Sequence, residues 1–229
     1  MALSQEVPIL QCPALNASTL CLDIKGGFDN ISCLVLTSLL RRKGIPHCLV
    51  SWVWSFLTER KCRLVFQGSL NVFSPVQVGT LQGSPVSPLL FVMYVSVLHL
   101  RILRGIRFSY VDDFTITLGS SSYRRNCQLF QYFHSVLKRR GTRIGLSFAV
   151  AKTELCHWRT PKDRDSTSTA AVCLDTIVFH PSSSVRWLGS WFTPSMETSV
   201  HFHKRLALDK GRSQLSSSSP HQGWAWHPI

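Results

Sequence analysis

Two short acidic segments constrain this chain most, because each places carboxylates among apolar residues. The segment LDIKGGFD contains Asp23 and Asp29, and the segment YVDD contains Asp112 and Asp113. These are four of the twelve acidic residues, in a chain with 25 Lys and Arg. A free carboxylate is costly in apolar surroundings. Acids at such positions in a basic protein therefore predict a divalent-cation site that faces a polyanion, as phosphoryl transfer requires.

Composition sets the broad class of the protein. The 229 residues, 45% of them hydrophobic, suffice for one large domain or two small ones with a buried core. The net charge of +13 indicates a polyanionic partner, with nucleic acid the first candidate and an anionic membrane surface the second. The longest apolar run, Leu89 to Leu98, is too short to span a bilayer. We therefore expect no membrane partner.

The cysteines and the N-terminal residues bear on the compartment. The eight cysteines form no CxxC and have no zinc-like spacing with histidine, which indicates reduced thiols and not a disulfide framework. The N-terminal MALSQEVPILQC has neither the basic region nor the long apolar stretch of a signal peptide. We expect an intracellular protein that is not secreted, in the nucleus or the cytoplasm.

Apolar spacing predicts a mixture of strands and helices. Strands are expected over residues 19–24, 62–66, 72–78, 106–110, 114–118 and 185–192. Helices are expected over about 31–43, 46–56, 89–103 and 121–141, with Ser87 and then Ser121 or Ser122 as N-caps of the last two. Asp112 and Asp113 fall at the tip of a predicted hairpin. Asp23, at a strand end, can join them if the strands are neighbours.

The order of five motifs resembles a known family. LDIKGGFDNI, VGTLQGSPVSPLLFVMYV, YVDD, AKTEL and VRWLGSWF are similar to palm motifs A to E of the reverse transcriptase domain of non-LTR (LINE-type) retrotransposons. LQGSPVSPLLF is the most specific block, whereas YVDD alone is weak. The resemblance covers residues 20–195 and implies an α+β right-hand polymerase palm, an antiparallel sheet backed by helices, with partial fingers. Residues 1–19 remain unassigned, and residues 196–229 are expected to be a disordered tail or a truncated thumb.

The resemblance implies a two-metal polymerase that extends a DNA primer on an RNA template with dNTP. Asp23 and Asp112 would bind Mg²⁺ or Mn²⁺, with Asp113 as the supporting acid. Lys152 in AKTEL would neutralise or protonate the departing pyrophosphate, although a surface lysine is the alternative. Phe28 would exclude a ribose 2′-hydroxyl, with a core phenylalanine as the alternative. Asp29 is expected to be a helix N-cap.

Further binding residues come from motifs B and E and from basic runs. The nucleotide and its templating base are expected to contact Gln82, Gly83 and Ser84. Nucleic acid is expected to contact Arg41, Arg42, Lys43, Trp187 and Gly189. Packing of an apolar strand explains Trp187 equally well, and Trp52 and Trp54 are expected in the core.

Two other functions remain open at this stage. Fewer residues precede motif A and follow motif E than complete fingers and thumb need. A catalytically inactive nucleic-acid-binding remnant of such an element is therefore one alternative. A group II intron maturase-like protein is the other, because it shares the palm.

Overall fold

The structure is a computed structural model. It describes residues 15–63, 65–66, 69–70, 72–99, 105–110, 112–159 and 169–197. The expected C-terminal tail beyond Glu197, most of the unassigned N-terminal segment and most of the polar stretch at 160–170 therefore lie outside the described residues.

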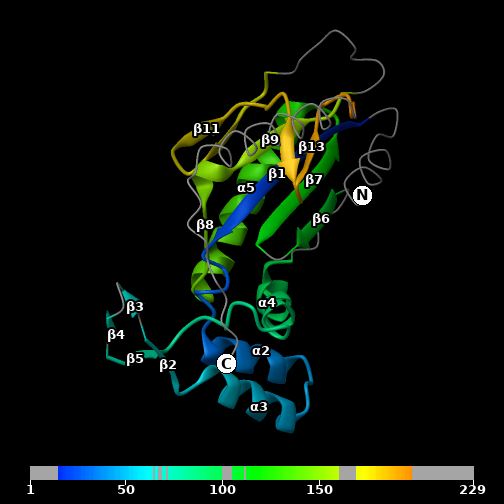
Figure 1. The fold of residues 1–229 in the computed structure, drawn as a ribbon. Coiled ribbons are helices and arrows are strands. Elements are labelled where there is room, and N and C mark those ends of the chain that lie inside the picture. Colours follow the sequence, from blue (N-terminus) through cyan, green and yellow to red (C-terminus); the bar gives the residue numbers. More distant parts are fainter. Residues whose placement is uncertain are drawn as a thin grey trace.

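The centre of the molecule is an antiparallel sheet whose strands come from distant parts of the chain (Figure 1). Its spatial order is β6 (Gly105–Tyr110), β7 (Asp113–Ser120) and β1 (Asn16–Lys25), and β1 also pairs with β8 (Ser147–Phe148) and β9 (Glu154–His157). All of these pairings are antiparallel. With helices packed against the sheet, this arrangement confirms the predicted α+β fold.

Helix α5 (Tyr123–Arg143) covers one face of the sheet, behind β1 and β7 in Figure 1. Its N-cap is Ser122, whose hydroxyl accepts a hydrogen bond from the backbone N–H of Arg125 at 3.2 Å. Phe130 and Leu137 on its inner face are fully buried. The cap satisfies a backbone donor that the helix itself leaves unpaired, so the predicted start of this helix is confirmed.

The strand β1 has two chemically different faces, because successive side chains in a strand point to opposite sides. Leu20, Leu22 and Ile24 belong to the main hydrophobic core, on the side of α5. Thr19 and Asp23 alternate with them and face the other side of the sheet. The polar face is therefore separated from the helix-covered core by the sheet itself.

Three helices lie beyond the end of β1 (Figure 1). They are α2 (Cys33–Arg42), α3 (His47–Leu57) and α4 (Ser87–Val95), and a 3₁₀ turn, η1 (Ser96–Leu98), follows α4. The expected extension of α4 to residue 103 is wrong, because the chain becomes extended at His99. Ser87 is the first residue of α4 and not its N-cap, because its hydroxyl donates to the carbonyl of Leu81 at 2.7 Å.

Asp29 does not cap α2, which corrects another expectation. The N-cap is Ser32, whose hydroxyl accepts from the N–H of Val35 at 3.4 Å. The chain makes a turn between β1 and α2, where Asp29 N–H bonds to Gly26 O at 3.1 Å. Asp29 is thereby left free to make a different contact, described below.

The remaining strands that the structure describes form four two-stranded antiparallel sheets. They are β2 (Arg60–Cys62) with β5 (Ser74–Val76), β3 (Val65–Phe66) with β4 (Ser69–Leu70), β10 (Val172–Leu174) with β11 (Ile177–Phe179), and β12 (Val185–Trp187) with β13 (Ser190–Phe192). The single late strand expected over 185–192 is therefore a hairpin. Its turn uses Leu188 and Gly189, both with positive φ, 48° and 76°.

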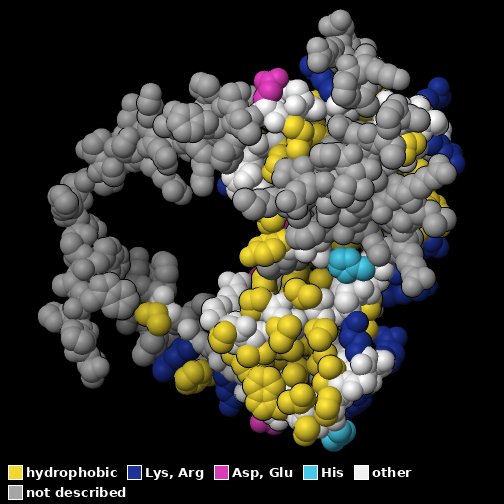
Figure 2. All heavy atoms as spheres, turned by 90° about the vertical axis from the view of Figure 1, so that its right-hand side faces the viewer, with side chains coloured by type: hydrophobic (Ala, Val, Ile, Leu, Met, Phe, Trp, Pro, Cys, Tyr) yellow, Lys and Arg dark blue, Asp and Glu magenta, His cyan; other side chains and the backbone are white. Residues whose placement is uncertain are grey.

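The tryptophans of α3 are exposed, contrary to expectation. Trp52 and Trp54 are 49% and 41% exposed, because Val50, Val53 and Leu57 form the buried face of this helix. Figure 2 shows hydrophobic side chains gathered on this lower part of the molecule, with Lys and Arg side chains beside them. Among the helices that the structure describes, none is long and apolar enough to cross a membrane.

Candidate active site

Two acidic side chains meet where β1 and β7 end. Asp23 and Asp113 are directly paired across the antiparallel ladder. Cross-strand partners point to the same face, so both carboxylates lie on the side away from α5. Asp112 precedes this pair in the turn, where it is exposed and its carbonyl accepts from the N–H of Ile24 at 3.1 Å. The register thus sets Asp113 directly opposite Asp23, and the metal-ligand role that the resemblance implies for Asp112 remains a prediction.

A cleft of about 320 Å³ surrounds this pair. Its lining residues are Cys21, Leu22, Asp23, Asp113, Phe114, Thr115, Lys152, Glu154, Arg186, Trp187, Leu188 and Gly189. They come from β1, β7, the segment around β9 and the β12–β13 hairpin. Residues of four separate motifs (A, C, D and E) are therefore brought together at one place.

The cleft holds an excess of closely spaced carboxylates. Burial raises the pKa of the Asp113 carboxyl, and the charges of Asp112 and Asp23 raise it further. Arg186 and Lys152 act in the opposite direction. The ammonium of Lys152 lies 3.0 Å from Asp23 Oδ2, and this hydrogen bond is the main cause of the raised Lys152 pKa. Like charges at this spacing disfavour ionisation, so the site gains from an added cation.

The donor set fits a hard divalent cation. Carboxylate oxygens are the ligands that Mg²⁺ and Mn²⁺ prefer, and Asp23 and Asp113 present them on one face. Within the described residues, no group of three or more His, Cys, Asp and Glu side chains stands ready to hold a metal ion. Asp23 is instead neutralised by Lys152.

The predicted nucleotide residues are joined by a contact that the sequence did not reveal. Gln82 Nε2 donates to Asp29 Oδ1 at 3.0 Å, and Thr80 N–H donates to Phe28 O at 2.8 Å. The half-buried ring of Phe28 stacks on Phe91, with centroids 4.9 Å apart and an interplanar angle of 23°. The turn after β1 and the loop before α4 are therefore one unit, which carries both Phe28 and Gln82.

Gly79 makes this close approach possible, and sequence reasoning missed it. Its φ is +85°, and its N–H donates to Ile31 O at 2.8 Å. A Cβ here would lie 3.0 Å from both the Cα and the carbonyl oxygen of Asp29. Gly83 also has a positive φ, +91°, but a Cβ there would meet open space. Only a glycine fits at Gly79 without movement of the neighbouring backbone.

The motif E residues divide into a buried and an exposed part. Trp187 is 3% exposed and packs with Ala17, Trp158 and Val185 in a second hydrophobic cluster. This burial supports the packing alternative, although Trp187 also lines the cleft, so its expected contact with nucleic acid remains a prediction. Gly189 lies in the turn that borders the cleft.

Two cleft residues escaped the sequence reasoning. Glu154 Oε2 accepts a hydrogen bond from the backbone N–H of Arg186 at 3.0 Å, which ties β9 to the β12–β13 hairpin. Arg186 lines the cleft, and its positive charge acts to lower the pKa of the Asp113 carboxyl. Both stand beside the recognised blocks, in AKTEL and VRWLG, but a single charged residue in such a block carries no signal of its own.

The remaining predicted residues lie outside the cleft. Ser84 borders the loop before α4, where its carbonyl accepts from Ser87 N–H at 3.2 Å. Arg41, Arg42 and Lys43 are exposed at the end of α2, and none of them lines the cleft. Their expected contact with nucleic acid remains a prediction.

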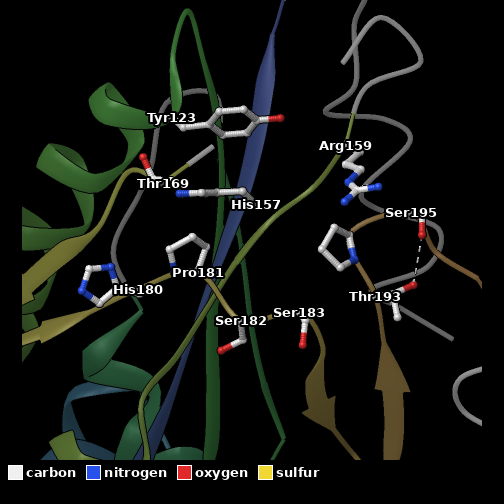
Figure 3. Close-up of a pocket in the computed structure, with 11 residues that line it drawn as sticks. Tyr123, His157, Arg159, Thr169, His180, Pro181, Ser182, Ser183, Thr193 and Ser195 are labelled. Carbon is white, nitrogen blue, oxygen red and sulfur yellow. Dashed lines mark hydrogen bonds between the residues drawn. The ribbon is translucent and has the colours of Figure 1, made fainter. Parts of the chain in front are cut away.

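A second cavity, of about 450 Å³, lies at the opposite end of β1 (Figure 3). Tyr123 and His157 form one wall, with ring centroids 4.7 Å apart. The two ring nitrogens of His157 are occupied by Ser18 Oγ and Ala170 O, each at 2.8 Å. Among the described residues that line this second cavity there is no carboxylate, whereas the first cleft contains the pair Asp23 and Asp113.

Comparison with solved structures identifies the same architecture in telomerases. Apo telomerase from Candida tropicalis, truncated from the C-terminal domain, gives a TM-score of 0.56 at 12% identity, over 86% of this chain and 39% of that one. Telomerase from Candida albicans in complex with a TWJ fragment of telomeric RNA gives a TM-score of 0.58 at 12% identity, over 86% of this chain and 33% of that one. The chain thus spans between a third and two fifths of these proteins, and the likeness concerns the fold.

Sequence comparison supplies the family. A search of curated protein sequences gave no match. The model of the reverse transcriptase (RNA-dependent DNA polymerase) family matches residues 8–192, which is most of the chain. With the five motifs in order and their acidic residues facing one another across β1 and β7, the chain belongs to the reverse transcriptase family.

Proposed function

We propose that this chain is the RNA-directed DNA polymerase domain of a LINE-type retrotransposon. It would add deoxynucleotides from dNTP to a DNA primer on an RNA template. The observation that carries the proposal is the pairing of Asp23 with Asp113 in a cleft that also contains Lys152 and the Leu188–Gly189 turn. Family membership supports the RNA template, and the motif sequences support the LINE type.

The residues of the cleft and of the adjoining loop would have separate roles in nucleotidyl transfer. Asp23 and Asp113 would hold Mg²⁺ or Mn²⁺, together with Asp112 from the adjacent turn, whose charge also acts on the Asp113 carboxyl. Bound ions of this kind lower the pKa of an attacking hydroxyl and neutralise a triphosphate. The Lys152 side chain is 72% exposed, so its ammonium can turn from Asp23 toward a departing pyrophosphate. Phe28 and Gln82, held together by the loop before α4, would position the sugar and base.

An inactive nucleic-acid-binding remnant is the second candidate. One observation favours it: Asp23, which would have to bind the metal ion, is paired with Lys152 at 3.0 Å. A site whose carboxylate stays neutralised in this way would bind nucleic acid through its basic residues and yet not transfer a nucleotide.

Extension of a primed RNA template with Mg²⁺ or Mn²⁺ separates the two candidates. If the chain is an active polymerase, the rate of primer extension should fall at least about 100-fold in Asp113→Asn, because charge stabilisation worth several kcal/mol is lost. The control is Glu197→Gln, which removes one carboxylate outside the cleft. Binding of the template without extension by the unaltered chain would instead establish the remnant.

Cation binding provides an independent readout. Mn²⁺ should raise the melting temperature of the unaltered chain, because a ligand that binds only the folded state stabilises it. The same shift should be absent in Asp113→Asn and retained in Glu197→Gln. Equal shifts in all three proteins would show that the cleft does not hold the ion.

A further inference from the structure

The last part of α5 carries a group of basic residues on the side of the sheet opposite the acidic cleft. Lys138, Arg139, Arg140 and Arg143 are exposed there, and we call them the basic ridge. The helix packs against the core face of β1, whereas Asp23 lies on the other face. The ridge is therefore separate from the site proposed for catalysis.

Two grooves flank the ridge and share Arg143. The first, of about 590 Å³, is lined by Leu34, Val35, Ser38, Arg42, Val97, Arg140, Arg143 and Ile144. The second, of about 670 Å³, is lined by Gln131, His134, Ser135, Lys138, Arg139, Thr142, Arg143, Cys173, Leu174 and Asp175. Arginines from α2 and α5 thus converge on one continuous surface.

The charges of this surface are largely uncompensated. None of the described residues lining the first groove is acidic, and Asp175 is the single acid lining the second. Asp175 is occupied by Lys138, at 2.8 Å. Arg42, Arg139 and Arg143 make no ion pair or side-chain hydrogen bond within the part of the chain that the structure describes. A shared anionic partner would offset the repulsion among them.

Stabilisation of helix ends explains only part of this arrangement. A cation in the last turn of a helix is worth about 0.3–1 kcal/mol, which accounts for Arg140 and Arg143 singly. It does not explain why Arg42, at the end of another helix, lines the same groove. Nor does it account for Arg139, which lines the second groove from outside the last turn.

We propose that the basic ridge binds the phosphate backbone of a nucleic acid outside the catalytic cleft. Guanidinium groups match phosphate oxygens in pairs, and a row of them contacts a backbone without reading its sequence. An acidic polypeptide is the competing partner, because carboxylates also pair with arginine. Phosphate is favoured because the whole chain carries a net charge of +13, and a nucleic-acid backbone is a polyanion with a charge at every nucleotide.

The test compares two double variants of the full chain with the same net charge. Arg139→Gln/Arg143→Gln alters the ridge, and Arg124→Gln/Arg125→Gln alters the other end of the same helix, about 20 Å away. Binding of a labelled RNA stem-loop is measured in EDTA across a salt series. The readout does not require polymerisation, so it succeeds or fails independently of the proposed function. Circular dichroism checks that both variants fold.

The ridge variant should flatten the slope of log K against log salt by about 1.4–1.8, or 0.7–0.9 for each lost phosphate contact. The control variant should change the slope by less than half as much. Equal changes in both variants would mean that only net charge matters, which overturns the proposal. It is equally overturned if the ridge variant loses affinity for polyglutamate while it keeps its affinity for RNA.

Discussion

Gly79→Ala should destabilise the fold and disturb the nucleotide residues together. Alanine at a left-handed φ costs about 1–2 kcal/mol wherever it occurs. At Gly79 the added Cβ would also lie 3.0 Å from two backbone atoms of Asp29. The segment must therefore move, which weakens the hydrogen bonds of Gly79 N–H to Ile31 O and of Thr80 N–H to Phe28 O, both 2.8 Å long. At about 1 kcal/mol each, the total loss is about 3–4 kcal/mol.

Gly44→Ala is the matched control for this substitution. Gly44 has a φ of +76°, close to the +85° of Gly79, but a Cβ there meets nothing within 4 Å. Gly44→Ala should lower the free energy of unfolding only by the cost of alanine at a left-handed φ, about 1–2 kcal/mol. The difference between the two variants therefore measures the contact between the turn after β1 and the loop before α4.

Urea unfolding followed by tryptophan fluorescence gives both free energies, because the chain contains seven tryptophans. Gly79→Ala should lose about 2 kcal/mol more than Gly44→Ala, the sum of the two weakened hydrogen bonds. Primer extension should fall in Gly79→Ala even at temperatures where it remains folded, because Gln82 loses its bond to Asp29. Equal unfolding free energies in the two variants would refute the reasoning.

Three further outcomes are expected. Lys152→Gln should slow primer extension and leave the urea midpoint unchanged, because its ion pair with Asp23 is exposed; a large loss of stability would assign Lys152 to the fold. Burial lowers the pKa of His134 and His157 below 6.5, so the unfolded chain binds protons that the folded chain does not. Stability should therefore fall below about pH 6.5, by at most about 1.4 kcal/mol per pH unit for each histidine, and a flat urea midpoint between pH 7.5 and 5.5 would contradict this. Phe28→Ala should raise the ratio of ribonucleotide to deoxynucleotide incorporation, whereas a loss of stability with an unchanged ratio would make Phe28 a core residue.

The sequence by itself determined the local elements and the order of the motifs. A short apolar run predicted the centre of β1, and Ser121 or Ser122 was the predicted cap of α5. The short gap between two predicted strands placed Asp112 and Asp113 at a hairpin tip, where Asp113 is in fact the first residue of β7. These features depend on local hydrophobicity and on backbone donors at helix ends, which act over a few residues. They are therefore readable without knowledge of the partners.

The tertiary structure alone decided which residues meet. The register of β1 and β7 set Asp113 opposite Asp23, and folding brought Lys152 to Asp23 from 129 residues away. It also gave Asp29 a partner in Gln82 in place of a helix end. Periodicity shows that a residue faces a core or solvent, but not which distant residue lies opposite, because that depends on how whole elements pack. The cleft and the two grooves along α5 form only when whole strands and helices pack together.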